Sequence, residues 1–148
     1  MPSLSILIVE DHEDSARAMA RLLQSEGHAV TTAFDFAGAL AVAAHMRSID
    51  VLVCDIALPD GDGCSLLRVL QERLNGPPRR CIALTGHTES HWIEECRRAG
   101  FQRCLSKPVV FDELLAALGT SVRTPPAGTA LGGVPSPGTL TDQDAAAR

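Results

Sequence analysis

Five polar residues stand out because each one ends or directly follows a short apolar segment: Glu10, Asp11, Asp55, Thr85 and Lys107. Three of them are carboxylic acids, and carboxylates that share a site repel one another and raise the pKa of at least one member. A divalent cation relieves this repulsion. Ligands that are all oxygen, in a shallow and partly solvated cleft, favour Mg²⁺. The residue types therefore predict a magnesium site, provided that the ends of these segments meet.

Asp55 closes the apolar run "DVLVCD" and is followed by "IALPDGDG". An ionised carboxylate beside a cation is a usable nucleophile toward phosphorus. Transfer of a phosphoryl group also needs neutralisation of charge on the moving oxygens. The Lys107 ammonium and the Thr85 hydroxyl can each contact one of them, and the glycine-rich loop lets backbone groups approach closely. We therefore expect Asp55 to accept a phosphoryl group.

The elements that must position these residues follow from periodicity and from turn residues. The run 50–55 is apolar on both faces, which indicates a central parallel strand covered by helices. Alternating strands and helices predict an α/β fold with a doubly wound parallel sheet, and the carboxyl ends of its strands form the functional crevice. Strands are expected at 4–9, 28–33, 50–55, 80–85 and 103–106. Helices are expected from Asp14 to Gly27, at 37–46, around Leu66–Leu74, at 89–99 with Trp92, Ile93, Cys96 and Ala99 inward, and at 112–122 with Leu114, Leu115 and Leu118 inward.

Composition narrows the class of protein. The 148 residues carry a net charge of −5 and no basic block, which argues against nucleic-acid binding by this chain. The apolar runs are too short to cross a bilayer, and the N-terminus does not resemble a signal peptide. The five cysteines are scattered, as in proteins with reduced thiols, so we expect a cytoplasmic location. A Pro/Gly-rich stretch, 124–148, is expected to be a flexible tail or linker after one domain at 1–123.

The motifs "LIVEDHEDS", "DVLVCDIALPDGDG", "ALTGH" and "LSKP" together resemble the receiver domains of two-component response regulators, over roughly residues 4–120. This resemblance implies a flavodoxin-like fold with strand order 2-1-3-4-5. It implies a phosphoaspartate switch that is not an enzyme, apart from loss of its own phosphoryl group. The implied partners are a histidine kinase or phosphotransfer protein and a downstream protein target or output domain. The chain would be a stand-alone regulator or part of a hybrid sensor kinase.

The resemblance also implies a role for each site residue. Asp11 would bind Mg²⁺ directly, Glu10 through water, and the backbone carbonyl of Ala57 would be a third protein ligand beside Asp55, the phosphorylated residue. Thr85 and Lys107 would contact the phosphoryl group, and the Lys107–Pro108 bond is a candidate cis peptide. The chain departs from the family at Cys104, where an aromatic ring is common. His87 and Ala57 occupy positions that border the attacking water in the family.

Several alternatives compete with this interpretation. "PDGDG" suggests a calcium loop, but the bidentate glutamate at position twelve is missing. His87 and His91 could clasp a metal at one helical turn, against the plainer interpretation of two solvated histidines at the start of a helix. The remaining alternatives are a Mg²⁺-dependent aspartyl-phosphate phosphatase of the haloacid-dehalogenase type and a degenerate receiver that serves only for docking. The phosphatase would need an acid/base group at position 57, which is an alanine.

Overall fold

The structure is a computed structural model that describes residues 3–74, 78–86 and 90–119; for residues 90–92 only the backbone is described. The chain divides into two compact units, Met1–Ala117 and Leu118–Arg148, and the fold below is that of the first unit. The predicted boundary at 123/124 lies outside the described residues and stays a prediction.

A five-stranded parallel sheet forms the centre of the first unit, with strand order β2-β1-β3-β6-β7. This confirms the predicted order 2-1-3-4-5, because β6 and β7 are the fourth and fifth strands of this sheet, whereas β4 and β5 form a short hairpin outside it. The strands are β1 (Ser5–Val9), β2 (Ala29–Ala33), β3 (Val51–Asp55), β6 (Arg80–Thr85) and β7 (Arg103–Ser106). All residues of β3 are buried, as expected for a strand covered on both faces.

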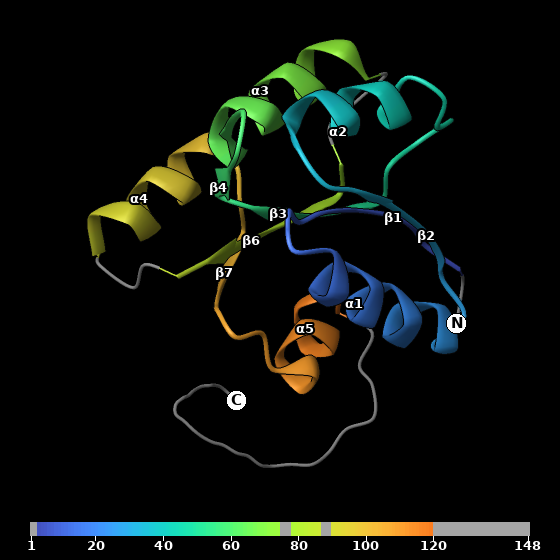
Figure 1. The fold of residues 1–148 in the computed structure, drawn as a ribbon. Coiled ribbons are helices and arrows are strands. Elements are labelled where there is room, and N and C mark those ends of the chain that lie inside the picture. Colours follow the sequence, from blue (N-terminus) through green and yellow to red (C-terminus); the bar gives the residue numbers. More distant parts are fainter. Residues whose placement is uncertain (1–2, 75–77, 87–89, 120–148) are drawn as a thin grey trace. The chain divides into compact units, whose positions relative to one another are not determined.

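Helices cover both faces of this sheet, with α2, α3 and α4 on one side and α1 and α5 on the other (Figure 1). They are α1 (Glu13–Ser25), α2 (Phe36–Ala43), α3 (Gly63–Arg73), α4 (Ser90–Ala99) and α5 (Phe111–Ala117). Ala16, Met19, Ala20 and Leu23 recur at helical spacing in α1 and form its buried apolar stripe. Burying one leucine of this stripe contributes roughly 1.5–3 kcal/mol.

Local sequence explains where the helices start and end. The side chains of His12, Asp35 and Asp62 cap α1, α2 and α3 by accepting a backbone N–H three residues ahead. Gly27 and Gly100 follow α1 and α4 with φ of 95° and 118°, a conformation that favours glycine over other residues. These glycines therefore end the two helices.

Two expectations need correction. Ile93 was expected to point inward, but it is 44% exposed. It lies about 60° around the helix axis from Cys96, on the side away from Ala99, so it falls at the margin of the buried stripe. The helix expected at 112–122 ends at Ala117 and is followed by a turn at 118–119, where Gly119 has a φ of 72°; residues 120–122 lie outside the described part.

A short hairpin was not anticipated at all. β4 (Ala57–Leu58) pairs antiparallel with β5 (Gly61–Asp62) through a turn at Pro59–Asp60. Two-residue strands are too short to produce a periodic pattern, so "PDGDG" indicates only a turn. The hairpin stands directly between Asp55 and the start of α3.

Candidate functional site

Glu10 follows β1 and is fully buried. Its Oε2 accepts the His12 backbone N–H at 2.9 Å and the Lys107 ammonium at 3.2 Å. Lys107 Nζ also lies 2.9 Å from Oε1, but this contact lacks hydrogen-bond geometry, so Oε1 is a buried oxygen without a hydrogen bond. Because a buried carboxylate needs compensation for lost hydration, Oε1 has capacity for a further cation.

Asp55 ends β3 with 3% of its surface exposed. Its Oδ1 accepts the Ala57 N–H at 3.2 Å, and its Oδ2 accepts the Lys107 ammonium at 2.7 Å. Burial raises the pKa of Asp55; the hydrogen bond and charge of Lys107 oppose this rise, and the nearby Glu10 adds to it. Two donors therefore hold the carboxyl group in place. Because burial still disfavours its ionised form, a nearby cation would stabilise that form further.

Lys107 follows β7 and joins the two acidic residues. Its backbone N–H donates to the Thr85 carbonyl at 2.9 Å, and the Lys107–Pro108 peptide is cis, as the family resemblance suggests. Partial burial lowers the pKa of the ammonium, but its hydrogen bonds to Asp55 and Glu10 outweigh this effect and raise the pKa above its usual value. Lys107 is therefore a fixed positive charge at the site.

Asp11 completes an acidic cluster. One ligand oxygen from each of Glu10, Asp11 and Asp55 can be chosen so that all three lie within 4.8 Å of one another. Asp11 is exposed, whereas the other two are buried. Hard carboxylate oxygens with one solvated member suit a divalent cation such as Mg²⁺, which keeps several waters. The cluster and the unbonded Oε1 of Glu10 thus fit the predicted metal.

The other predicted residues lie around this cluster. Asp55 pairs with Leu84 across the sheet, so Thr85, which is 5% exposed, lies one position beyond that partner. Ala57 donates its N–H to Asp55, while the role of its carbonyl stays a prediction. Cys104 is half-buried against the hydrophobic core. The proposed histidine pair, His87 and the His91 side chain, lies outside the described residues.

Two features of the site carry no clear signal in the sequence. One is the ion pair between Glu10 and Lys107, which depends on three-dimensional register between β1 and β7. The other is Asp60, whose carboxylate accepts the backbone N–H groups of Phe36 and Ala37 at the start of α2. For Asp60, the segment "PDGDG" predicts a turn, but nothing in the sequence indicates which residues that turn contacts.

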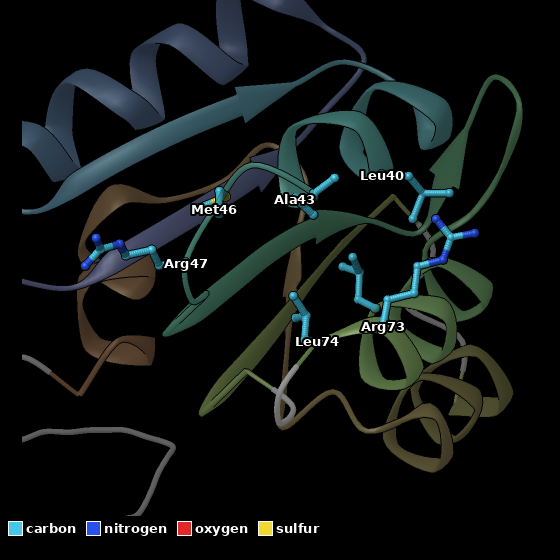
Figure 2. A pocket seen from close by; sticks show the side chains of 8 residues that line it. Leu40, Ala43, Met46, Arg47, Arg73 and Leu74 are labelled. Carbon is cyan, nitrogen blue, oxygen red and sulfur yellow. The ribbon is translucent and has the colours of Figure 1, made fainter.

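A groove of about 460 Å³ lies beside the cluster, between α1 and the segment that enters α5. We call it the α1–α5 groove; its lining residues are Glu10, His12, Ser15, Ala18, Met19, Lys107, Pro108, Val109 and Phe111. A separate hollow of about 240 Å³ lies between α2 and α3. Figure 2 shows the side chains that line it, among them Leu40, Met46 and Leu74. Met46 and Leu74 precede β3 and β6, so this hollow lies toward the opposite ends of the strands from Asp55.

Residues 6–119 match the response regulator receiver domain family, and the chain belongs to this family. It is therefore a receiver domain, a signalling switch that works through phosphorylation of an aspartate, as the sequence motifs predicted. The described part of the chain contains no helix that is both apolar enough and long enough to span a membrane.

Relatives include both sensor histidine kinases and transcriptional regulatory proteins. The chain is 34% identical over 116 residues to the sensor histidine kinase RcsC of Salmonella typhi, covering 78% of this chain and 12% of that protein. It is 35% identical over 118 residues to the transcriptional regulatory protein KdpE of Mycobacterium tuberculosis, covering 80% of this chain and 50% of that protein. The chain thus spans half or less of the length of these relatives.

Solved structures show the same fold. A response regulator from Burkholderia pseudomallei, with a phosphorylated aspartic acid, a calcium ion and citrate, has a TM-score of 0.71 and 28% identity, covering 80% of this chain and 68% of that one. The chemotaxis response regulator CheY4 of Vibrio cholerae has a TM-score of 0.69 and 25% identity, covering 80% of this chain and 98% of that one.

Proposed function

We propose that Asp55 accepts a phosphoryl group from a histidine kinase or a phosphotransfer protein in a reaction that depends on Mg²⁺. The observation that carries this proposal is that Asp55 takes part in two interactions at once. Its buried carboxylate forms an ion pair with the Lys107 ammonium and also belongs to the acidic cluster. A solved relative that holds a phosphorylated aspartic acid and a calcium ion supports the same chemistry.

In the proposed step, an Asp55 oxygen forms a bond to phosphorus while the bond from phosphorus to the donor histidine nitrogen breaks. The nitrogen leaves with the electron pair and the donor returns to its unphosphorylated form. Lys107 contacts one phosphoryl oxygen through its ammonium, and Thr85 donates its hydroxyl to another. Glu10, Asp11, Asp55 and the Ala57 carbonyl would hold Mg²⁺, which when bound supplies positive charge to the phosphoryl oxygens.

The α1–α5 groove is the proposed approach for the phosphodonor protein. Its lining includes Glu10 and Lys107, and the Lys107 ammonium lies 2.7 Å from Asp55, so a partner seated there would lie beside the phosphoacceptor. Val110 and Phe111 at the start of α5 are 52% and 41% exposed, which provides apolar contact surface beside a charged site. Apolar side chains next to a polar site are typical of protein interfaces.

The new charge on Asp55, about −1.5 to −2, is the proposed signal. Drawing Thr85 and its loop inward would bias a two-state equilibrium and change the surface formed by α4, β7 and α5 for a downstream protein or output domain. A cytoplasmic location belongs to the proposal; all five cysteines are free thiols, which supports it. Loss of the phosphoryl group to water would reset the switch.

The two competing functions have less support. A phosphatase of the haloacid-dehalogenase type needs an acid/base group two residues after the nucleophile, and Ala57 has none. A degenerate receiver would have lost part of the polar set, whereas Glu10, Asp11, Asp55, Thr85 and Lys107 are all present.

The test is phosphorylation of the chain by a small phosphodonor, acetyl phosphate, with and without Mg²⁺. Intact-mass measurement should detect one added phosphoryl group in the wild-type chain with Mg²⁺ and none in an Asp55→Asn variant. An Asp50→Asn variant is the matched control, since Asp50 precedes β3, at the opposite end of that strand from Asp55, where its carboxylate accepts the Ser5 backbone N–H. Labelling of Asp55→Asn at the wild-type level would show that another residue is the acceptor.

A further inference from the structure

The hairpin β4–β5 carries its turn residue Asp60 onto the first turn of α2. Asp60 Oδ1 accepts the Phe36 N–H at 2.7 Å, and Oδ2 accepts the Ala37 N–H at 3.1 Å. Both bonds join a carboxylate to backbone donors 23 or 24 residues away in the chain. Charge-assisted bonds at a helix N-terminus are among the stronger hydrogen bonds in proteins.

Helix α2 already has a cap of its own. Asp35 Oδ1 accepts the Gly38 N–H at 2.6 Å. This N-cap leaves the N–H groups of Phe36 and Ala37 in the first turn without a partner within the helix, and Asp60 accepts both. The turn also lies against the Phe36 ring, because a Cβ added to Gly61 would come within 2.6 Å of it. The contact between turn and helix is therefore close, and its polar part depends on Asp60.

The base of the same hairpin is joined to the phosphoacceptor. Ala57 donates its N–H to Asp55 Oδ1, and the Gly63 N–H donates to the Ile56 carbonyl at 2.8 Å. Leu58 packs against the core. The hairpin is thus fixed at its base by the sheet and at its turn by α2, and Ala57 lies between these two points.

We propose that Asp60 is a positioning residue for the metal-binding loop. By holding the turn on α2, it keeps the backbone of Ala57 in place relative to the carboxylates of Glu10, Asp11 and Asp55. Without this contact the hairpin would sample more conformations, and Mg²⁺ would have to order it on binding. The inference rests on the proposed function, in which these groups bind Mg²⁺.

The experiment is isothermal titration of the full chain with Mg²⁺, at a temperature well below unfolding. Asp60→Ala should weaken Mg²⁺ binding by about tenfold, the lower end of the effect of other residues that orient metal ligands. Asp60→Asn, which can accept only one of the two bonds well, should give an intermediate affinity. Asp35→Ala is the control, because it removes a cap from the same helix without touching the hairpin; its affinity should stay within about twofold of wild type.

Measurements at high salt distinguish a positioning role of Asp60 from electrostatic attraction between its negative charge and Mg²⁺. Asp60 is itself negative, and its attraction for Mg²⁺ through solvent should fade at high ionic strength. We therefore expect the affinity difference between wild type and Asp60→Ala to persist in 0.5 M KCl, a concentration at which the screening length is on the order of 4 Å. A difference that disappears in salt would overturn the inference.

The outcomes also separate this inference from the proposed function. A wild-type chain that does not bind Mg²⁺ overturns the proposed function and this inference with it. Wild-type binding together with unchanged affinity in both Asp60 variants, or with an equal loss in Asp35→Ala, overturns the inference alone. If Asp60→Ala does not fold, Asp60→Asn decides the matter: weaker binding supports positioning and wild-type affinity contradicts it.

Discussion

Lys107 is the residue on which the balance of charge in the site depends. Its ammonium lies 2.7 Å from Asp55 and 2.9 Å from Glu10, two carboxylates that are almost fully buried. Lys107→Ala would leave both without their cation, and an unpaired buried charge is strongly unfavourable. We expect the free energy of unfolding to fall by about 1–3 kcal/mol, measured by urea denaturation, since partial exposure of Lys107 moderates the effect.

Added Mg²⁺ should recover part of this loss, because in the proposed function the cation would bind the same carboxylates. The control is Arg17→Ala, which removes an exposed ion pair with Glu13 on α1; such pairs contribute about 0–1 kcal/mol. Equal losses for Lys107→Ala and Arg17→Ala would show that the Lys107 pairs contribute no more than a surface salt bridge.

At the scale of elements, the step from β3 into α3 requires a residue without a side chain. A Cβ on Gly63 would lie 2.6 Å from the Asp55 carbonyl oxygen and 3.2 Å from Cys54 Sγ, and the first of these is backbone that cannot turn away. Gly63→Ala should therefore destabilise the fold by about 1–3 kcal/mol, the usual effect of overpacking. Thermal unfolding followed by circular dichroism would measure it.

Gly86, after β6, provides the comparison for that substitution. A Cβ there meets nothing within 4 Å, and its φ lies outside the left-handed region. Gly86→Ala should change the stability by no more than about 0.5 kcal/mol, or raise it slightly by restricting the unfolded chain. A Gly63→Ala variant as stable as Gly86→Ala would mean that α3 can shift away from β3 freely.

The sequence predicted the sheet and its helices well because long apolar runs and helical spacing leave few alternatives. It predicted that Glu10, Asp11, Asp55 and Lys107 lie at strand ends, and parallel topology then brings strand ends to one edge. It could not predict which side chains bond, since the Glu10–Lys107 pair and the Asp60 contact depend on distances between distant elements. It also gave no sign of the two-residue strands of the hairpin, which have no period to detect.

For the molecule as a whole, metal binding and folding should be coupled. The acidic cluster combines two residues that follow β1 with the last residue of β3, so a cation that binds all three would bind the folded chain and not the unfolded one. Linkage then requires that stability rises with metal concentration, by about 2.7 kcal/mol when free Mg²⁺ is 100 times its dissociation constant. A domain of this size should melt roughly 10 °C higher under those conditions.

The matched variants for this prediction are Asp11→Asn and Asp14→Asn, two exposed acidic residues near the start of α1. Asp11 belongs to the cluster, so its variant should show a much smaller rise in melting temperature with MgCl₂, whereas Asp14→Asn should respond like wild type. Each titration is compared with KCl at equal ionic strength, because general screening of a chain with a net charge of −5 also changes stability. If MgCl₂ and KCl stabilise the wild-type chain equally, the cluster does not bind the cation specifically, and the carboxylates of Glu10 and Asp55 are compensated by Lys107 and their backbone N–H donors without a metal.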